Sequence, residues 1–295
     1  MLTFILLFTI FVILTVVATF LWSFRVAYKI YHPKRQVTGK KPSDFGMKYK
    51  EFTTMTADGY AIKGWLCDPG NTERTIIMCH NIGASKEKFL SYGKFLYDSG
   101  YNVVLFDFRS HGESQLDRGA FKQAQKWAKD LDAIIAYSIK AVHPKSIGVM
   151  GFSFGAISSI YAANTNSSVK AIILDSGPPD ELDDTLYRLY GRVSNAPYFI
   201  FESIFEITVK KMIGAKHYPT VVLEGLKNLS PKAIFFIHGD RDNIIPSKSS
   251  EMLFNEYAKE PKELWLVPGS HHLTNYRLYK KEYESRVKRF FSKHL

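Results

Sequence analysis

Short apolar runs alternate along this chain with longer segments in which apolar residues recur every three or four positions. The short runs are bounded by turn residues, as buried strands are, and the longer segments have the period of amphipathic helices. Regular alternation of the two predicts an α/β fold with a mostly parallel, doubly wound sheet. Strands are predicted at 48–56, 61–67, 74–79, 102–106, 147–150, 169–174, 233–237 and 264–267, and helices at 86–99, 127–142, 156–163, 251–257 and 276–295.

Two segments depart from this alternation, and the first is at the N-terminus. Leu2–Phe24 contains 23 positions without a charged residue. As a helix it would span about 35 Å, against a hydrocarbon core of about 30 Å. We therefore predict a transmembrane anchor at 1–25. A secretory signal peptide is the alternative, but no basic residue precedes the run and no small-x-small cleavage site closes it.

The second departure is the segment 178–228, which is too long for a plain connection between a strand and a helix. Its apolar residues recur mainly at helical spacing. We predict a helical lid inserted over the functional site. The residues concerned either seat the insertion on the core or line an acyl pocket, and they are Tyr187, Tyr190, Tyr198, Phe199, Phe201, Phe205, Met212 and Ile213.

The charge of the chain is concentrated beside the predicted anchor. The formal net charge is +11, and between Arg25 and Lys50 there are eight basic residues and one acidic residue. This segment therefore carries +7 and leaves +4 for the remainder. We predict a basic juxtamembrane linker at 26–47 that contacts the membrane, and no nucleic-acid partner. By the positive-inside rule, we expect the domain at 48–295 to face the cytoplasm, and the alternative is a single N-terminal anchor that presents the domain outside.

A glycine-flanked serine lies at the centre of the predicted sheet. The pentapeptide Gly151-Phe152-Ser153-Phe154-Gly155 joins a predicted strand to a predicted helix, which is the context of a nucleophile elbow. Glycines two positions either side remove the collisions that such a sharp turn would cause. The turn would raise the Ser153 hydroxyl above the sheet and aim the Phe154 N–H at an oxyanion. On its own, the pentapeptide fits an ordinary helix cap equally well.

Possible partners of Ser153 follow two later strands. Asp242 lies just beyond the strand at 233–237, and His271 and His272 lie just beyond the strand at 264–267. The chain order of serine, aspartate and histidine, each past the carboxyl end of a strand, differs from the orders in chymotrypsin-like and subtilisin-like enzymes. It favours one hydrolase fold.

On these residues, the sequence from Lys48 to the C-terminus resembles the α/β-hydrolase superfamily, in the branch that includes bacterial membrane-anchored esterases and lipases. Three further stretches carry the resemblance. Asp58-Gly59 resembles the turn of the opening hairpin, and Asp107–Ser114 is close to the motif Asp-x-Arg-Gly-His-Gly-x-Ser. His80-Asn81-Ile82-Gly83 is similar to the family's His-Gly-x-Gly loop, although Asn81 stands where glycine is usual.

The resemblance implies a role for several side chains and amide groups. His272 would be the general base, with His271 as the alternative, and Asp242 would be its carboxylate. Asp240 would shape the acid loop, and Asp175 is a less favoured substitute for Asp242. The N–H groups of Ile82 and Phe154 would form the oxyanion hole. His111 is expected to be an internal hydrogen-bonding residue.

These roles predict a serine hydrolase that forms an acyl-enzyme on Ser153 and cleaves carboxylic esters with lipid-like or medium-chain acyl groups. Serine at the nucleophile position disfavours haloalkane and epoxide chemistry. The alternatives are a serine peptidase or acyltransferase of the same fold, and a catalytically silent, membrane-tethered binding scaffold. No cofactor or metal is expected, and Cys67 and Cys79 are predicted to be buried packing residues.

Overall fold

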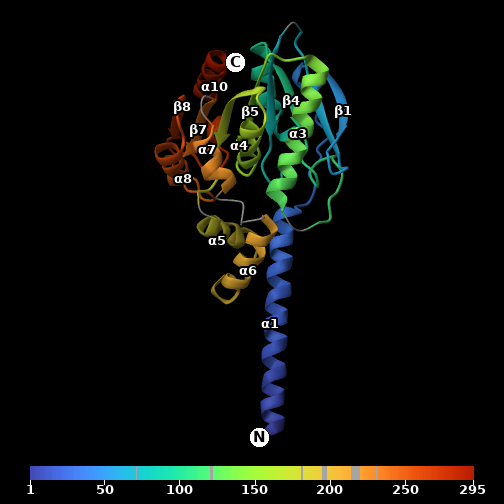
Figure 1. Ribbon diagram of the computed structural model, residues 1–295, viewed down its shortest axis with the longest axis vertical. Coiled ribbons are helices and arrows are strands. Elements are labelled where there is room, and N and C mark those ends of the chain that lie inside the picture. Colours follow the sequence, from blue (N-terminus) through green and yellow to red (C-terminus); the bar gives the residue numbers. More distant parts are fainter. Residues whose placement is uncertain (71, 120–121, 181, 195–197, 214–219, 230–231) are drawn as a thin grey trace.

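A single eight-stranded sheet forms the centre of the computed structural model, which describes residues 1–295 except 71, 120–121, 181, 195–197, 214–219 and 230–231 (Figure 1). The strand order is β1-β2-β4-β3-β5-β6-β7-β8. β1 and β2 form an antiparallel hairpin, β2 is antiparallel to β4, and the remaining neighbours are parallel. The strands are β1 (Tyr49–Met55), β2 (Ala61–Cys67), β3 (Arg74–Cys79), β4 (Asn102–Phe106), β5 (Ser146–Phe152), β6 (Val169–Asp175), β7 (Ala233–Gly239) and β8 (Lys262–Val267). The predicted fold class is confirmed.

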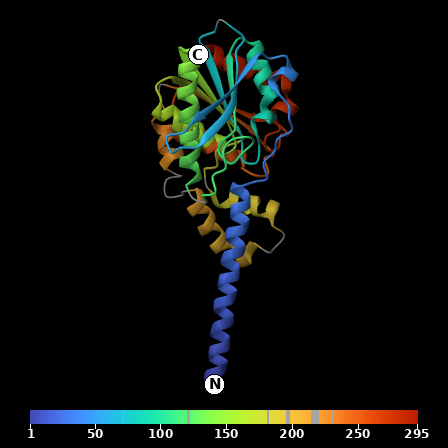
Figure 2. The same ribbon diagram turned by 90° about the vertical axis from the view of Figure 1, so that its right-hand side faces the viewer.

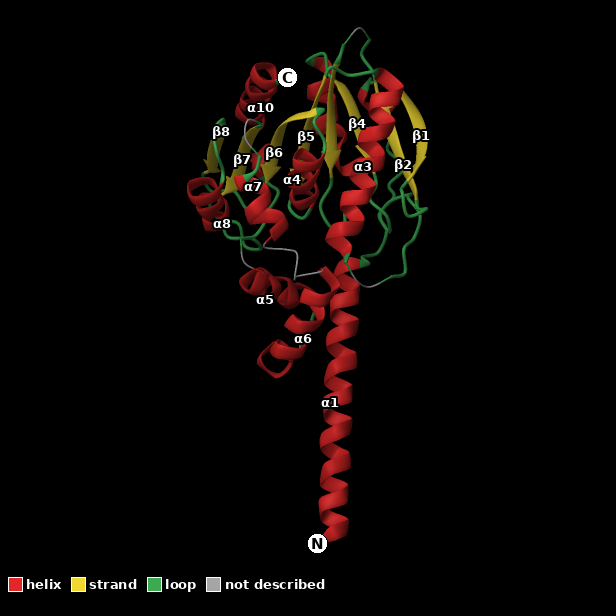
Figure 3. Ribbon diagram, in the orientation of Figure 1, coloured by secondary structure: helices red, strands yellow, loops and turns green. Residues whose placement is uncertain are grey.

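Helices cover both faces of this sheet (Figure 3). Alternate side chains of a strand point to opposite faces, and in β3 the side chains of Ile77 and Cys79 belong to one core, whereas those of Ile76 and Met78 belong to the other. Both faces are buried, which explains why the central strands are continuously apolar. The first core includes residues of α3 (Gln123–Val142) and α4 (Gly155–Thr165), and the second includes residues of α2 (Leu90–Asp98) and α10 (Lys280–His294).

The predicted helices differ from the observed ones mainly at their ends. A 3-10 turn (Lys86–Phe89) precedes α2, and the final predicted helix is divided into α9 (Asn275–Leu278) and α10. After the acid loop, α8 (Ser247–Met252) continues as a π-helical turn (Leu253–Tyr257). Cys67 and Cys79 are buried and free, as predicted.

The N-terminal helix α1 (Leu2–Tyr31) projects from the domain, and the C-terminus lies at the opposite end of the molecule (Figures 1 and 2). Its large apolar side chains are exposed from Leu2 to Trp22, whereas Val26, Ala27 and Ile30 are buried. α1 therefore includes residues 26–31, which the sequence analysis assigned to the juxtamembrane linker. Among the described residues, α1 alone is long and apolar enough to cross a membrane, a property that it shares with signal sequences.

The insertion between β6 and β7 is helical, with α5 (Leu182–Val193), α6 (Tyr198–Ile213), a π-helical turn (Thr220–Glu224) and α7 (Gly225–Lys227). α1 packs against α6 and α5 (Figure 1). Tyr190 and Phe205 are buried, and their rings pack edge to face with their centroids 4.9 Å apart. Tyr187, by contrast, is 57% exposed. The side chains of Tyr198, Phe199, Phe201, Met212 and Ile213 lie outside the described part of the structure.

Polar contacts fasten the segment after α1 to the carboxyl edge of the parallel strands. His32 Nε2 lies 3.1 Å from the carbonyl oxygen of Asp117, and Arg35 donates to the carbonyl of His111 at 3.3 Å. The Thr38 N–H donates to the Glu87 carboxylate at 2.6 Å. This segment is consequently attached to the loops that follow β3 and β4.

Candidate active site

Ser153 occupies a strained turn between β5 and α4. Its φ of +54° lies in the left-handed region, which a residue other than glycine seldom adopts. A Cβ atom on Gly151 would lie 2.6 Å from Cα of Ala156, and one on Gly155 would lie 2.3 Å from the carbonyl oxygen of Cys79. The two glycines therefore allow α4 to start directly over the end of the sheet.

The structure brings Ser153, His272 and Asp242 together in one hydrogen-bonded line. His272 Nε2 lies 3.1 Å from Ser153 Oγ, and His272 Nδ1 lies 2.7 Å from Asp242 Oδ2. Asp242 follows β7, and His272 follows β8, so the two loops meet at the carboxyl edge of neighbouring parallel strands. With Nδ1–H directed at the carboxylate, Nε2 is free to accept the proton of the serine hydroxyl.

Asp242 is held as a carboxylate by four donors. Oδ1 accepts hydrogen bonds from the N–H groups of Ile244 (2.8 Å) and Ile245 (3.0 Å). Oδ2 accepts from His272 and from His238 Nε2, the latter at 3.2 Å. Burial raises the pKa of Asp242, but the hydrogen bonds and the electrostatic attraction of His238 and His272 together lower it by more, and the pKa lies well below its usual range.

His238 is a contributor that the sequence analysis did not identify. The side chain is fully buried, and its Nδ1 lies 2.7 Å from Ser250 Oγ, while Nε2 also lies 2.9 Å from the carbonyl oxygen of Ile245. With Ser250 donating to Nδ1, the Nε2–H is directed at Asp242. The available signal was the position of His238 at the start of the stretch His-Gly-x-x-Asp that contains the acid.

The alternative residues lie elsewhere in the site. His271 is exposed, and its backbone N–H donates to Thr274 Oγ1 at 2.9 Å. Asp175 is buried at the end of β6 and binds the hydroxyl of Tyr283 (2.6 Å) and the amide of Asn275 (2.7 Å). Asp240 accepts a hydrogen bond from the N–H of Gly269 at 2.7 Å and so ties the acid loop to the histidine loop.

The loop after β3 carries Ile82, one of the two expected oxyanion donors. The Ile82 N–H has no hydrogen-bond partner among the described residues, and the Asn81 side chain donates to the Ile82 carbonyl at 2.8 Å. His80 supports this loop from beneath, because its Nδ1 lies 2.8 Å from the Asn81 carbonyl oxygen and its Nε2 accepts the N–H of Phe108 at 2.9 Å. Phe154 caps the first turn of α4.

The loop after β4 is a buried polar network. Arg109 is fully buried, pairs with both oxygens of Asp58 (2.9 and 3.0 Å), and donates through Nε to Asp130 at 2.8 Å. His111 Nδ1 lies 3.0 Å from the Arg109 carbonyl oxygen. Burial, and to a smaller extent the adjacent His80 ring, lowers the pKa of His111 to about 3. His111 is thus a neutral, internal hydrogen-bonding residue.

The arrangement has the parts needed for acyl transfer: a hydroxyl nucleophile, a neutral imidazole, a carboxylate that orients it, and amides near the nucleophile. Within the described residues, His, Cys, Asp and Glu side chains form no group of three or more that could hold a metal ion.

Comparison with known proteins agrees with this architecture. Residues 74–221 match the family described as the alpha/beta hydrolase fold. The chain is 28% identical to the uncharacterised Bacillus subtilis protein YqkD over 250 residues, covering 83% of this chain and 79% of that protein. It is 26% identical to the Penicillium polyketide transferase grgF over 265 residues, covering 76% of this chain and 88% of that protein.

Among solved structures, the Pyrococcus furiosus esterase Pf2001 superposes with a TM-score of 0.76 at 27% identity, covering 90% of this chain and 99% of the esterase. The strand order, the serine turn between β5 and α4 and these similarities agree: the chain belongs to the α/β-hydrolase family.

Proposed function

We propose that the protein is a serine hydrolase that cleaves carboxylic esters through an acyl-enzyme on Ser153. The observation that carries this proposal is the bridge made by His272, which lies 3.1 Å from Ser153 Oγ and 2.7 Å from Asp242 Oδ2. A serine hydroxyl is a poor nucleophile at neutral pH unless a positioned base accepts its proton. Similarity to an esterase supports the same reaction class.

In the proposed cycle, His272 Nε2 accepts the proton of Ser153 as Oγ attacks the ester carbonyl carbon. The tetrahedral oxyanion lies against the N–H groups of Ile82 and Phe154, and collapse expels the alcohol, which takes the proton from His272. Water then repeats the sequence on the acyl-enzyme and releases the carboxylic acid. The ionised Asp242 stabilises the imidazolium formed in each half-reaction.

Three alternative functions would use the same site. Transfer of the acyl group to an acceptor other than water is supported by the similarity to a polyketide transferase. A peptidase would require amide substrates to fit the same oxyanion hole. A silent binding scaffold is disfavoured by the complete hydrogen-bonded line from Ser153 to Asp242, because a scaffold has no need of it.

We also propose that α1 anchors the protein in a membrane. Its exposed part, 2–22, would span about 32 Å as a helix, which matches a hydrocarbon core of about 30 Å. Its last turns are buried against the domain, and the following segment is fastened to the loops after β3 and β4. The carboxyl edge of the sheet would consequently face the lipid surface, on the cytoplasmic side if the basic segment obeys the positive-inside rule.

This placement favours lipid-like or medium-chain acyl esters. α5 and α6 pack beside α1 (Figure 1). On α6, the side chain of Ile207 is 56% exposed. An apolar side chain beside the proposed membrane anchor would contact lipid or the acyl chain of a substrate. Each methylene of that chain removed from water contributes about 0.8 kcal/mol to binding. The insertion would act as the predicted lid.

Labelling with a fluorophosphonate probe tests the proposed chemistry. The full-length protein in detergent should be labelled, and Ser153→Ala should not. Absence of labelling beside a labelled control hydrolase would leave the silent scaffold.

A series of p-nitrophenyl esters then measures the preferred acyl chain length. An optimum above eight carbons is expected, and activity on the acetate ester alone would contradict a lipid-like substrate. Protease protection in intact cells tests the cytoplasmic orientation.

A further inference from the structure

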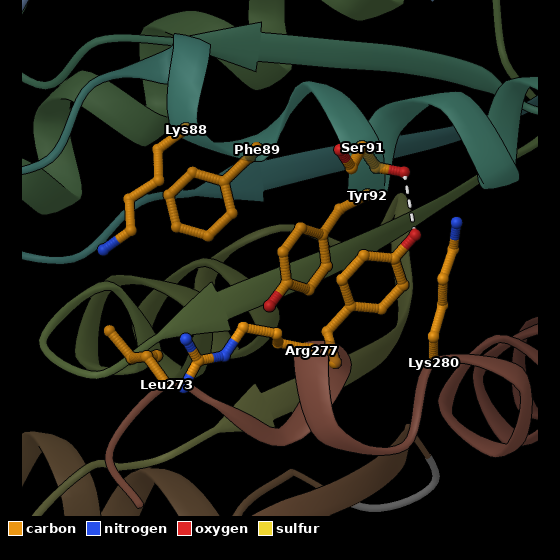
Figure 4. Close-up of a pocket in the computed structure, with 8 residues that line it drawn as sticks. Lys88, Phe89, Ser91, Tyr92, Leu273, Arg277 and Lys280 are labelled. Atoms are coloured by element: carbon orange, nitrogen blue, oxygen red, sulfur yellow. Dashed lines mark hydrogen bonds between the residues drawn. The ribbon is translucent and has the colours of Figure 1, made fainter.

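A cavity of about 410 Å³ lies beside the proposed catalytic histidine (Figure 4). Its walls are aromatic and apolar, with contributions from Phe89, Tyr92, Tyr276 and Leu273. Lys88, Arg277 and Lys280 complete its lining. In Figure 4 the ends of Lys88 and Arg277 lie on the Leu273 side, and the Tyr92 hydroxyl is directed toward Arg277. The cavity thus combines apolar walls with two cationic side chains, Lys88 and Arg277, on its Leu273 side and a third, Lys280, on the other.

The charges of this cavity are unbalanced. No Asp or Glu lines it, and Lys88, Arg277 and Lys280 form no ion pair with a carboxylate in the described part of the chain. Glu284 is directed at the Tyr276 hydroxyl, which lies 2.9 Å from its Oε1. All three cationic residues are exposed, and the ends of Lys88 and Arg277 lie on the same side of the cavity, so an anion bound between these two would accept charge-assisted hydrogen bonds from both.

The chain neighbours of two proposed catalytic residues line the cavity or pack against its walls. Leu273 directly follows His272 in the chain. Phe152, which directly precedes Ser153, packs against two cavity walls: its ring centroid is 4.3 Å from that of Phe89 and 5.1 Å from that of Tyr92. Lys88 and Leu273 follow β3 and β8, so the cavity lies at the carboxyl edge of the sheet, the edge that carries Ser153.

We propose that this cavity binds an anionic group of the phosphate class that is part of the ester substrate, while the acyl carbonyl lies at Ser153. The inference rests on the proposed ester hydrolysis and adds a substrate class to it: amphiphilic esters with a negatively charged head group. Lys88 and Arg277 bind the anionic oxygens, the Tyr92 hydroxyl donates to them, and the aromatic walls contact the adjoining carbon atoms.

Binding to a catalytically inert protein tests the cavity separately from the chemistry. The full-length protein carrying Ser153→Ala, in an uncharged detergent, is titrated by calorimetry with butyl phosphate and with inorganic phosphate. Butyl phosphate should bind more tightly than inorganic phosphate. Arg277→Gln and Lys88→Gln should each weaken its binding about tenfold, which corresponds to about 1.4 kcal/mol. Lys281→Gln, an exposed neighbour that does not line the cavity, is the control of equal charge and should bind as the parent does.

Three results of this titration would overturn the proposal. Absence of binding of either phosphate, or equal weakening by Lys281→Gln, would show that the cavity has no specific anion site. Equal affinity for inorganic and butyl phosphate would identify a site for free phosphate instead of a substrate head group.

Ester hydrolysis provides a second test of the cavity. Hydrolysis of an acylglycerol phosphate is compared with that of the neutral acylglycerol of the same chain length, with Ser153 intact. Arg277→Gln should raise KM for the anionic ester about tenfold, because one charge-assisted contact is lost. The kcat for the anionic ester and the KM for the neutral ester should not change. If both esters are hydrolysed and the variants change neither KM, the cavity proposal fails and the proposed function stands. If neither ester is hydrolysed, the proposed function fails, and the titration alone decides the anion site.

Discussion

Removal of α1 in two steps should separate its role as an anchor from its role in the fold. A chain that begins at Ser23 lacks the exposed part of the helix, and a chain that begins at His32 also lacks its buried turns. Val26 and Ile30 are 3% and 5% exposed, and Ala27 is fully buried. Complete burial of a Val or Ile side chain contributes about 1.5–3 kcal/mol. The second deletion should therefore cost about 3–6 kcal/mol, a large share of the 5–15 kcal/mol typical of a domain.

Urea unfolding and hydrolysis of a water-soluble short-chain ester would measure the two effects. The chain beginning at Ser23 should keep the unfolding free energy and the activity of the full-length protein in detergent. The chain beginning at His32 should unfold at lower urea concentration, because α6 would expose the surface that α1 covers, whereas its hydrolysis of the short-chain ester below the unfolding transition should persist. Equal stability of the two shortened chains would refute the reasoning, since the buried turns would then contribute nothing to the domain.

Three substitutions test the geometry of the site. Gly155→Ala places a Cβ 2.3 Å from a backbone oxygen and should cost about 1–3 kcal/mol of unfolding free energy with loss of activity, whereas Gly191→Ala, in open space, should cost nothing; equal effects in urea unfolding would contradict this. His238→Leu should lower kcat with little change in KM and cost about 1–3 kcal/mol, and His238→Gln should restore part of kcat through its side-chain N–H; no difference between the two would exclude a positioning role. Because the folded-state pKa of Asp242 is depressed, its ionised form stabilises the fold above about pH 4, and this contribution is lost as the pH falls below that value. As the pH is lowered from 6 to 3, the Asp242→Asn variant should therefore lose less unfolding free energy than the parent protein. If the unfolding free energy depends on pH identically in both proteins, that result would be evidence against the four-donor environment of Asp242.

Much of the fold was predictable because its signals are local. β2, β3 and β4 coincide with the predicted strands at 61–67, 74–79 and 102–106, since each is an apolar run closed by turn residues. The serine turn was predictable for a similar reason, because glycines two positions from Ser153 are required by contacts within the same turn.

Features that depend on distant partners were not predictable in this way. The helix of the anchor was expected to end near residue 25, yet it continues to Tyr31, where Val26 and Ile30 are buried and α1 packs against α6 and α5, far along the chain. In the sequence, His238 directly follows the predicted strand at 233–237 and precedes Gly239. Its bond to Asp242 depends on Ser250 and the Ile245 carbonyl, which hold the ring in one orientation.

The loops that carry the acid and the base are fastened to each other independently of the insertion. Asp240 accepts the N–H of Gly269, and the Arg241 N–H donates to the Ser270 carbonyl at 2.9 Å. Gly239 lies so close to Ser270 that a Cβ would be 2.3 Å from its carbonyl oxygen. These contacts join the ends of β7 and β8, so they hold the loops of Asp242 and His272 together at the edge of the sheet. The surrounding α1, insertion and cationic cavity can then determine which ester reaches Ser153 without altering the geometry that would cleave it.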